Sequence, residues 1–445
     1  MSVAELQRAE LQEQKSFKDF CVFFDDSKKD ADVDASFVGV RIENGEPQFH
    51  FPVGYSPASS ADCEKLDERE LRRDFLCLLR LLSDNDLMQG SVAKDAEFVN
   101  SMDFPVQAYM KVLDSFLERG YFFETEIQYK NASSGKVNWN RTIKMMQPRL
   151  VQNDNGEHSV IYLDLIRRCL NHNEDSLITH VHKYCVYDAV KKLGPLYGLF
   201  VECVDQPELQ FNYSLFAGVL QEKLSRTFDD RHIDLFESLL QIVEYIDRKN
   251  PMGEDSTEDT RFGVNKFAPV WERLIENIFG TENQRDYYPH CHWNLGGAGS
   301  HDADVHNTMR PDTVMKVGEG ANSETFILDA KYYKHCVSGA NLPASDSITK
   351  QLAYAEYAEN VKGLDGSLIY NAFILPYCAT EKSEYLYGMK RFGFAYGDWN
   401  NPDAANAKPY YRIAGIMLDV KSVMRSYGKN ASAQKELAEL VKGCV

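Results

Sequence analysis

Two short apolar segments, each with an acidic residue at one end, constrain the fold of this chain more than any other feature. Residues 310–333 read RPDTVMKVGEGANSETFILDAKYY. The pattern predicts a strand ending at Asp312, a polar turn with glycine over residues 318–323, and a second strand over 325–328 that leads into Asp329-Ala330-Lys331. We therefore expect two carboxylates and one lysine at adjacent strand ends.

Such a trio suits phosphodiester cleavage. Mg²⁺ takes oxygen ligands and keeps positions open for water and a phosphate oxygen. Asp312 and Asp329, with the main-chain carbonyl of Ala330, are the candidate Mg²⁺ ligands. Because side chains alternate along a strand, Lys331 lies on the face of Asp329, where it can orient the attacking water and offset charge on the phosphate. The alternative is a polar hairpin with a solvated edge.

A short amphipathic helix is predicted upstream, over residues 267–280. Pro269 lies near its start, apolar residues recur at helical spacing and Gly280 ends it. Glu272 falls in the predicted first turn, where it can reach the metal directly or through a water. The alternative is that Glu272 only complements the helix dipole.

A second helix is predicted downstream, over residues 346–359, with Asp346 or Ser347 as its cap. Lys350, Gln351 and Tyr354 cluster on it, because residues three and four apart are neighbours on a helix. An amide and a cation there can touch the water or the scissile phosphate. The alternative is a helix surface with a tyrosine packed on the sheet.

A helical Glu, then Pro-Asp, then Asp-X-Lys, then a helix with Gln is the motif order of the PD-(D/E)XK nuclease superfamily. Within it, the chain resembles the LlaJI-type restriction endonucleases, which are related to McrC nuclease subunits. The matching segments lie between about Tyr121 and the end of the chain, at residues 135–139, 142–143, 182–184, 270–272, 310–312, 329–333 and 349–351.

The resemblance implies a fold, an activity and a partner. Glu272, Asp312 and Asp329 would be the acidic catalytic residues, Lys331 the catalytic lysine and Gln351 a supporting residue. The chain would be the Mg²⁺-dependent nuclease subunit of a bacterial restriction system, a type II-like endodeoxyribonuclease that cuts double-stranded DNA with an AAA+ NTPase of the McrB kind. This sequence spaces its helix residues as Gln351-X-X-Tyr354, whereas RecB-like nucleases have three intervening residues, so the resemblance assigns Tyr354 no role.

The fold that follows is α/β of the mixed α+β kind. A PD-(D/E)XK core with a mixed central sheet flanked by helices is expected at residues 263–445, after a linker at 251–262. Residues 1–250 are expected to form a mostly helical partner- or DNA-recognition region with a small β unit. Its hairpin is predicted at residues 37–51, since Asn44-Gly45 favours a type I′ turn.

The charge of the 445-residue chain is unevenly distributed. From Phe262 onward there are 19 Lys and Arg against 21 Asp and Glu, and before it 30 against 46, within a net charge of −18. Because phosphate contacts are made by Lys and Arg, the acidic N-terminal part suits a protein partner better than a general DNA clamp. No apolar run approaches the roughly 18 residues of a membrane span, so we expect a cytoplasmic protein without membrane contact.

Two further groups of residues in the N-terminal region are candidates for ligand binding. Lys136, Trp139, Arg141 and Lys144 could contact nucleic acid, but a loop anchored to the core by its tryptophan is the favoured interpretation. His180 and His182 lie two positions apart in a helix predicted over residues 176–193, so they do not face one ligand and are expected to be structural.

Two other functions are compatible with the same residues. One is a stand-alone DNA nuclease of repair or mobile elements. The other is a non-catalytic assembly or recognition subunit, against which the intact Asp312, Asp329 and Lys331 argue.

Overall fold

The computed structural model describes residues 16–24, 37–56, 66–152, 155, 157–249, 259–294, 302–304, 309–332 and 342–444. The chain forms two compact units, one of residues 1–104 with 257–445 and the other of residues 105–256. The first hundred residues therefore belong with residues 257–445, and not with residues 105–250 as expected from the sequence. Most of the predicted linker, residues 251–258, lies outside the described residues.

The small β unit predicted near the N-terminus is present. Strands β2 (Val38–Glu43) and β3 (Glu46–His50) pair antiparallel, and positive φ angles at Asn44 (50°) and Gly45 (81°) form the predicted type I′ turn. Strand β1 (Cys21–Val22) extends this sheet on the β3 side. Helix α3 (Glu68–Leu82) packs its buried side beside the hairpin, where the rings of Phe49 and Phe75 lie 5.0 Å apart.

A strand from far along the chain completes this sheet. Strand β10 (Thr260–Val264) pairs antiparallel with β2 and with β4 (Phe98–Asn100). Residues 260–262 were assigned from the sequence to the linker, and this assignment is wrong because they are hydrogen-bonded in the sheet. Gly39 and Gly263 face each other across β2 and β10, where a Cβ on Gly263 would lie 2.2 Å from the Val38 carbonyl oxygen.

The central sheet of the same unit is mixed, as expected. Its described strands follow the order β13-β14-β15-β17-β16. Strands β14, β15 and β17 run parallel, and β13 and β16 pair antiparallel at the two edges. Their bounds are β13 Thr313–Val317, β14 Glu324–Ala330, β15 Ile369–Tyr377, β16 Lys390–Ala395 and β17 Ile413–Asp419.

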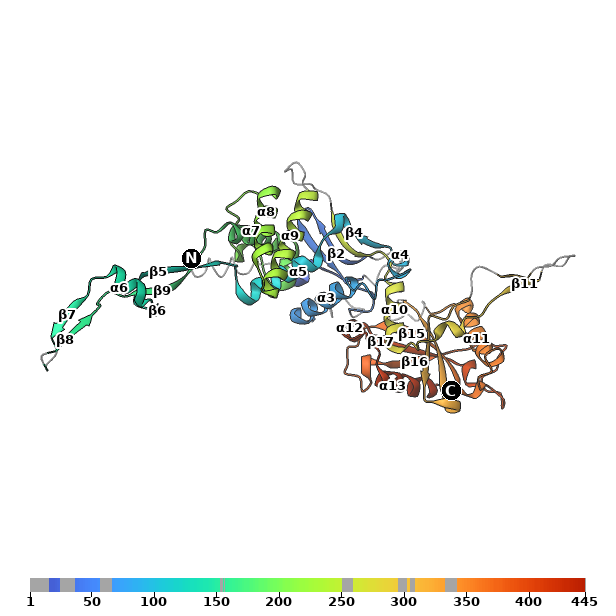
Figure 1. The fold of residues 1–445 in the computed structure, drawn as a ribbon. Coiled ribbons are helices and arrows are strands. Elements are labelled where there is room, and N and C mark those ends of the chain that lie inside the picture. Colours follow the sequence, from blue (N-terminus) through green and yellow to red (C-terminus); the bar gives the residue numbers. More distant parts are fainter. Residues whose placement is uncertain are drawn as a thin grey trace, which may run out of the picture. The chain divides into compact units, whose positions relative to one another are not determined.

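Helices flank this sheet (Figure 1). Helix α11 (Ser345–Asn360) buries Leu352 and Ala355 in one cluster with Ile327 and Phe373 of the sheet. Helices α10 (Ala268–Phe279) and α13 (Ala431–Lys442) contact the sheet and each other. Lys442 of α13 pairs with Glu324, which alternates away from Ile327, so α13 lies on the face opposite α11. The short helices α4 (Val92–Asp95) and α12 (Val420–Arg425) and the hairpin of β11 (His292–Asn294) and β12 (Asp302–Asp304) complete the unit.

The second unit joins a helical bundle to a projecting arm (Figure 1). The bundle contains α5 (Val106–Arg119), α7 (Leu177–Tyr197), α8 (Tyr213–Arg226) and α9 (Asp230–Lys249). The arm consists of β5 (Glu124–Asn131), β6 (Lys136–Val137), α6 (Trp139–Met145), β7 (Arg149–Gln152), β8 (His158–Ile161) and β9 (Ile166–Asn173).

Two predictions for this unit are wrong and one is confirmed. Helix α7 does not end before Gly194-Pro195 but continues to Tyr197, because Gly198 adopts the left-handed conformation that closes a helix. Trp139 does not anchor a loop to the core: it opens helix α6 and is 56% exposed. His182 is structural, since its buried ring accepts a hydrogen bond from the Phe122 N–H, and burial lowers its pKa to about 4.

Among the described residues, none of the helices combines the length and apolar character that a membrane span requires.

Candidate active site

The two aspartates predicted to meet lie at one end of the β13–β14 hairpin. Strand β13 begins at Thr313, directly after Asp312, and does not end there as predicted. Thr313 pairs with Leu328, so Asp312 stands across the hairpin from Asp329, the penultimate residue of β14. The predicted position of this strand is wrong, because Pro311-Asp312 precedes the strand and does not end it. The two carboxylates still meet, since the partner strands are antiparallel.

Short contacts hold these groups in place. The Ala330 N–H donates to Asp312 Oδ2 over 2.9 Å, and Lys331 Nζ lies 3.0 Å from Asp329 Oδ2. The Lys331 N–H donates to the Ile374 carbonyl oxygen of β15 over 2.9 Å, which fixes the backbone that carries the ammonium group. Asp329 is buried with 8% of its surface exposed. The lysine therefore partly compensates a charge that water cannot reach freely.

Glu272 approaches the same site from α10. The helix starts at Ala268, so Glu272 belongs to its second turn and not to the first turn predicted from the sequence. Burial raises the pKa of the Glu272 carboxyl from 4.5 to about 7; the positive charge of Lys331 opposes this shift and the negative charge of Asp329 adds to it. Glu272 and Asp312 line the same pocket, so the Glu272 carboxyl lies near the start of β13. An interpretation limited to the helix dipole does not account for that position.

The Asp312 carboxyl is also shifted. Burial raises its pKa well above the ordinary value of 3.8, and the hydrogen bond to Asp329, the charge of Asp329 and the charge of Glu272 add to the shift, against the opposing effect of Lys331. Glu272 and Asp312, the two carboxyl groups with raised pKa values, thus lie near Asp329 and the Lys331 ammonium group. A divalent cation would relieve the repulsion among these carboxylates.

Helix α11 covers the hairpin with two of its three candidate side chains. It begins at Ser345 after Ala344, one or two residues before the predicted cap at Asp346 or Ser347. Gln351 is fully buried, and its Nε2 donates to the Ile327 carbonyl oxygen over 2.6 Å, while its Oε1 has no hydrogen-bond partner among the described residues. The Tyr354 hydroxyl donates to the Arg310 carbonyl oxygen over 3.0 Å.

The third candidate on α11, Lys350, is exposed and lies 4.0 Å from Asp346. It points to solvent and does not join Gln351 and Tyr354. The predicted three-residue cluster is therefore reduced to two buried residues. Burial near Asp329 and Asp312 raises the pKa of the Tyr354 hydroxyl to about 12, so that this group stays a hydrogen-bond donor at neutral pH.

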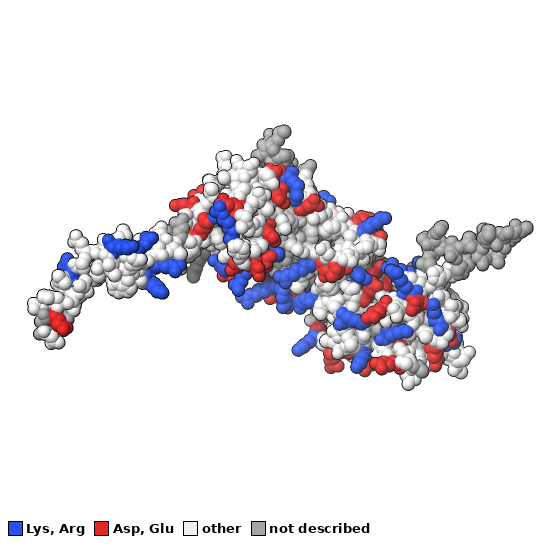
Figure 2. Space-filling model, in the orientation of Figure 1, with Lys and Arg blue, Asp and Glu red and all other residues white. Residues whose placement is uncertain are grey.

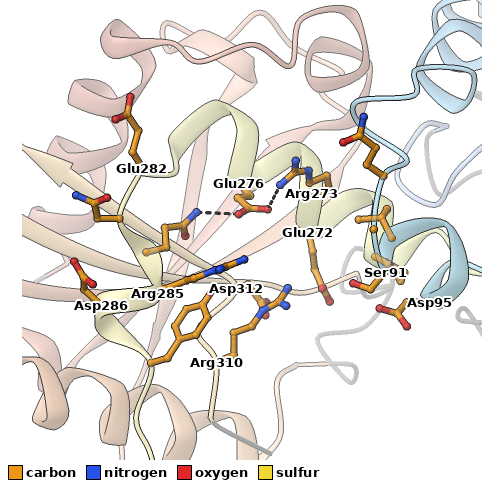
Figure 3. Close-up of a pocket in the computed structure, with 17 residues that line it drawn as sticks. Ser91, Asp95, Glu272, Arg273, Glu276, Glu282, Arg285, Asp286, Arg310 and Asp312 are labelled. Carbon is orange, nitrogen blue, oxygen red and sulfur yellow. Dashed lines mark hydrogen bonds and ion pairs between the residues drawn. The ribbon is translucent and has the colours of Figure 1, made fainter.

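A pocket of about 700 Å³ opens beside these carboxylates (Figure 3). Glu272 and Asp312 line it, as do three arginines that the sequence analysis did not select: Arg273, Arg285 and Arg310. Arg310 directly precedes Pro311-Asp312 in the sequence, which is a local signal that could have singled it out. Arg285 lies in an otherwise featureless polar segment, and no pattern marks it.

Comparisons with known proteins agree with the resemblance. A family model described as LlaJI restriction endonuclease matches residues 49–418, most of the chain and all five predicted catalytic positions. The chain belongs to the LlaJI restriction endonuclease family. No curated protein matches the chain. Among solved structures, the chain is similar to one titled as a refined half-complex from a tetradecameric assembly of Thermococcus gammatolerans McrB AAA+ hexamers with bound McrC.

That structural likeness is distant. It covers 92% of this chain and 83% of the other, at 15% sequence identity and a TM-score of 0.32. A score this low supports no argument about fold or partner. Membership in the LlaJI family therefore rests on the family match, which begins within β3 and ends within β17.

The donor set of this LlaJI-family chain fits Mg²⁺. Among the described residues, no three His, Cys, Asp or Glu side chains form a group that could hold a metal ion. Mg²⁺ does not require one, because proteins usually hold it through one or two carboxylates while water and substrate phosphates fill the other positions. Asp312, Asp329 and the Ala330 carbonyl would be its direct ligands, and Glu272 would reach it directly or through a water.

Proposed function

We propose that this chain is a Mg²⁺-dependent endodeoxyribonuclease of the PD-(D/E)XK type and the nuclease subunit of a bacterial restriction system. One observation carries the proposal: Asp312, Asp329 and Lys331 meet at one end of a hairpin, beside the Glu272 carboxyl and a polar pocket. Membership in a restriction endonuclease family supports the DNA substrate.

The chain's own groups have distinct tasks in this scheme. When bound, Mg²⁺ supplies a positive charge that polarises the scissile phosphate and lowers the pKa of a water. Asp312 and Asp329 position that ion, and the backbone of both is held by the antiparallel hairpin. Lys331 orients the attacking water and balances charge that develops on the phosphate. Gln351 holds β14 in place through its hydrogen bond to the Ile327 carbonyl oxygen.

Substitution within the hairpin tests the catalytic assignment. Asp329→Asn and Lys331→Ala should each lower cleavage of unmethylated DNA by roughly two to three orders of magnitude, the loss expected when a transition-state contact is removed. Glu319→Gln and Lys316→Ala are matched controls, because both are exposed residues of the same hairpin. The assay uses the complete complex with its NTPase and Mg²⁺. Unchanged cleavage by Asp329→Asn would end the catalytic assignment.

We further propose that the chain works with an AAA+ NTPase and that residues 1–250 provide the docking region. Within these residues, the arm from β5 to β9 exposes large apolar side chains, and this exposure does not stabilise an isolated chain. Met145, Leu150, Leu163 and Leu170 are each at least 63% exposed. Figure 2 shows Lys and Arg side chains along the same arm. Apolar side chains among cationic ones suit a protein partner with an acidic rim.

The partner assignment has its own test. Leu150→Asp with Leu170→Asp should abolish copurification with the NTPase and leave the melting of the nuclease unit unchanged. Val361→Asp is a control, because this residue is 64% exposed but lies outside the arm. If the isolated wild-type chain cuts DNA without nucleotide or partner, the stand-alone nuclease is the better description.

A further inference from the structure

Two arginines in the pocket beside the carboxylates form no ion pair with any described residue. Arg285 lies in the 3₁₀ turn Gln284–Tyr287 and Arg310 lies just before β13. Both are exposed, and neither forms an ion pair with any residue that the structure describes. Arg273 lines the same pocket, but Glu276 neutralises it over 2.7 Å. Arg285 and Arg310 therefore differ from Arg273 in having no ion-pair partner among the described residues.

The backbone beneath Arg285 is fixed on both sides. Gln284 is buried; its Oε1 accepts from the Val314 N–H of β13 over 2.8 Å, and its Nε2 donates to Glu276 Oε1 of α10 over 3.0 Å. Tyr287, two residues after Arg285, is buried in the cluster beneath α11. Arg285 thus projects from a turn that is held to two elements of the site.

Arg310 is held in a similar way. The Tyr354 hydroxyl of α11 donates to its carbonyl oxygen, and Pro311 and Thr313 after it are buried. Its guanidinium group lies close enough to Glu272 to oppose that residue's charge. Figure 3 shows the side chains of Arg285 and Arg310 extending into the region toward which Glu272 and Asp312 also point.

The chemistry of the two side chains selects the ligand. A guanidinium group presents a planar set of donors that matches the oxygens of a phosphate and forms two parallel hydrogen bonds to it. A DNA strand that places one phosphate at Asp312 and Asp329 carries further phosphates on either side. Without compensating cations, the acidic side chains around the pocket would repel that strand; besides Glu276, which pairs with Arg273, they are Asp95, Glu272, Glu282, Asp286 and Asp312.

We propose that Arg285 and Arg310 bind the backbone phosphates next to the scissile phosphate and so position the cut strand in this pocket. The inference rests on the proposed nuclease function and adds to it a binding site for the substrate strand. Arg273 is not included in this site, because Glu276 already neutralises its charge.

DNA binding at several salt concentrations tests the proposal separately from catalysis. The full chain, in complex with its NTPase, carries Asp329→Asn to prevent cleavage and is titrated with duplex DNA that the wild-type complex cuts. Arg285→Gln and Arg310→Gln should each reduce the slope of log K against log salt by about 1, as expected when one phosphate contact is lost. Arg285→Lys and Arg310→Lys should retain the slope, since a lysine keeps the charge.

Arg273→Gln is the matched control and should leave the slope unchanged. It removes an arginine that lines the same pocket but whose charge Glu276 already neutralises. In the Asp329→Asn background, the substitutions at Arg285 and Arg310 are measured by DNA binding alone. With Asp329 intact, the same substitutions should lower kcat/KM for cleavage by roughly 10- to 100-fold, as expected for the loss of a hydrogen-bonded charge contact. Melting temperatures within about 2 °C of wild type show that the fold is retained.

The outcomes separate this inference from the proposed function. If Asp329→Asn abolishes cleavage while both glutamine variants keep the wild-type slope and rate, the phosphate-binding role of the arginines is overturned and the nuclease assignment stands. If the wild-type complex fails to cleave but the glutamine variants lose slope, the pocket binds DNA backbone and the nuclease assignment falls.

Discussion

Arg425 of α12 makes a bidentate ion pair with Asp74 of α3, with distances of 2.6 and 2.7 Å, across 351 positions of sequence. Asp74 is fully buried and also accepts a hydrogen bond from the Tyr55 hydroxyl over 2.8 Å. The pair therefore ties the helix beside the N-terminal hairpin to the helix that follows the last parallel strand of the nuclease sheet. Removal of Arg425 would leave buried Asp74 with the Tyr55 hydroxyl and the more distant guanidinium group of Arg73, 3.7 Å away.

Arg425→Ala should lower the free energy of unfolding by roughly 2–4 kcal/mol. Breaking a fully buried pair costs about 3–5 kcal/mol. We expect a smaller loss here because the Arg425 side chain is 33% exposed. Lys350→Ala, which removes an exposed pair with Asp346, should cost less than about 1 kcal/mol. Urea denaturation measures both. Equal midpoints for the two variants would contradict a structural role for the Asp74 pair.

The metal-free protein should become less stable as pH rises through neutrality. The pKa of Glu272 is raised from 4.5 to about 7, so the folded state holds a proton that the unfolded state has lost between these values. The stabilising contribution is complete below pH 4.5 and is lost as pH passes about 7. Asp312, whose pKa is also raised, acts in the same direction.

Glu272→Gln should therefore melt higher than wild type at pH 8 in EDTA, by a few degrees, and the difference should shrink at pH 5. Glu319→Gln, on the exposed turn of the hairpin, should follow the wild-type curve at every pH. Thermal melts across this range measure the effect. Parallel curves for wild type and Glu272→Gln would show that this carboxyl is not destabilised by its surroundings.

Mg²⁺ should raise the melting temperature of the wild-type chain, and more at pH 8 than at pH 5.5. The ion replaces repulsion among carboxylates, and at a hundredfold excess over its Kd a ligand stabilises the folded state by about 2.7 kcal/mol. Protons compete for the same oxygens at low pH. Asp329→Asn should lose the response, and NaCl at equal ionic strength should not reproduce it. A response retained in Asp329→Asn would place the ion elsewhere.

Local signals accounted for much of the fold and of the site. Asn44-Gly45 predicted the first hairpin correctly, and apolar spacing with Pro269 and Gly280 predicted α10 to within one residue at each end. The Asp-X-Lys motif predicted a lysine beside an aspartate, and the structure places Lys331 3.0 Å from Asp329. These features depend on residues close in sequence, where spacing and turn chemistry carry the information.

Features that depend on distant residues could not be predicted in this way. Strand β10 looked like the end of a linker, because nothing in Thr260 to Val264 indicates that its partners are β2 and β4, far earlier in the chain. The strand beside Asp312 was expected before this residue, whereas β13 follows it at Thr313–Val317. The pocket arginines Arg285 and Arg310 come together only through tertiary packing.

Another long-range contact lies next to Lys331. The hydroxyl of buried Tyr332 accepts a hydrogen bond from the Val53 N–H over 2.6 Å, and the ring packs 5.5 Å from that of Phe267. Tyr332 follows Lys331 directly, so this bond fixes the end of the segment that carries the ammonium group. The N-terminal hairpin region thereby contributes to the position of Lys331.

Tyr332→Phe should lower the free energy of unfolding by roughly 1–3 kcal/mol, since the Val53 N–H loses this acceptor in a buried place. It should also lower kcat for DNA cleavage more than it changes KM, because a displaced Lys331 stabilises the transition state less while the DNA still binds. Tyr385→Phe is the control, since that tyrosine is 38% exposed and its loss should change neither quantity. Destabilisation without a change in kcat would limit Tyr332 to a role in folding and would show that Lys331 keeps its position without the Val53 bond.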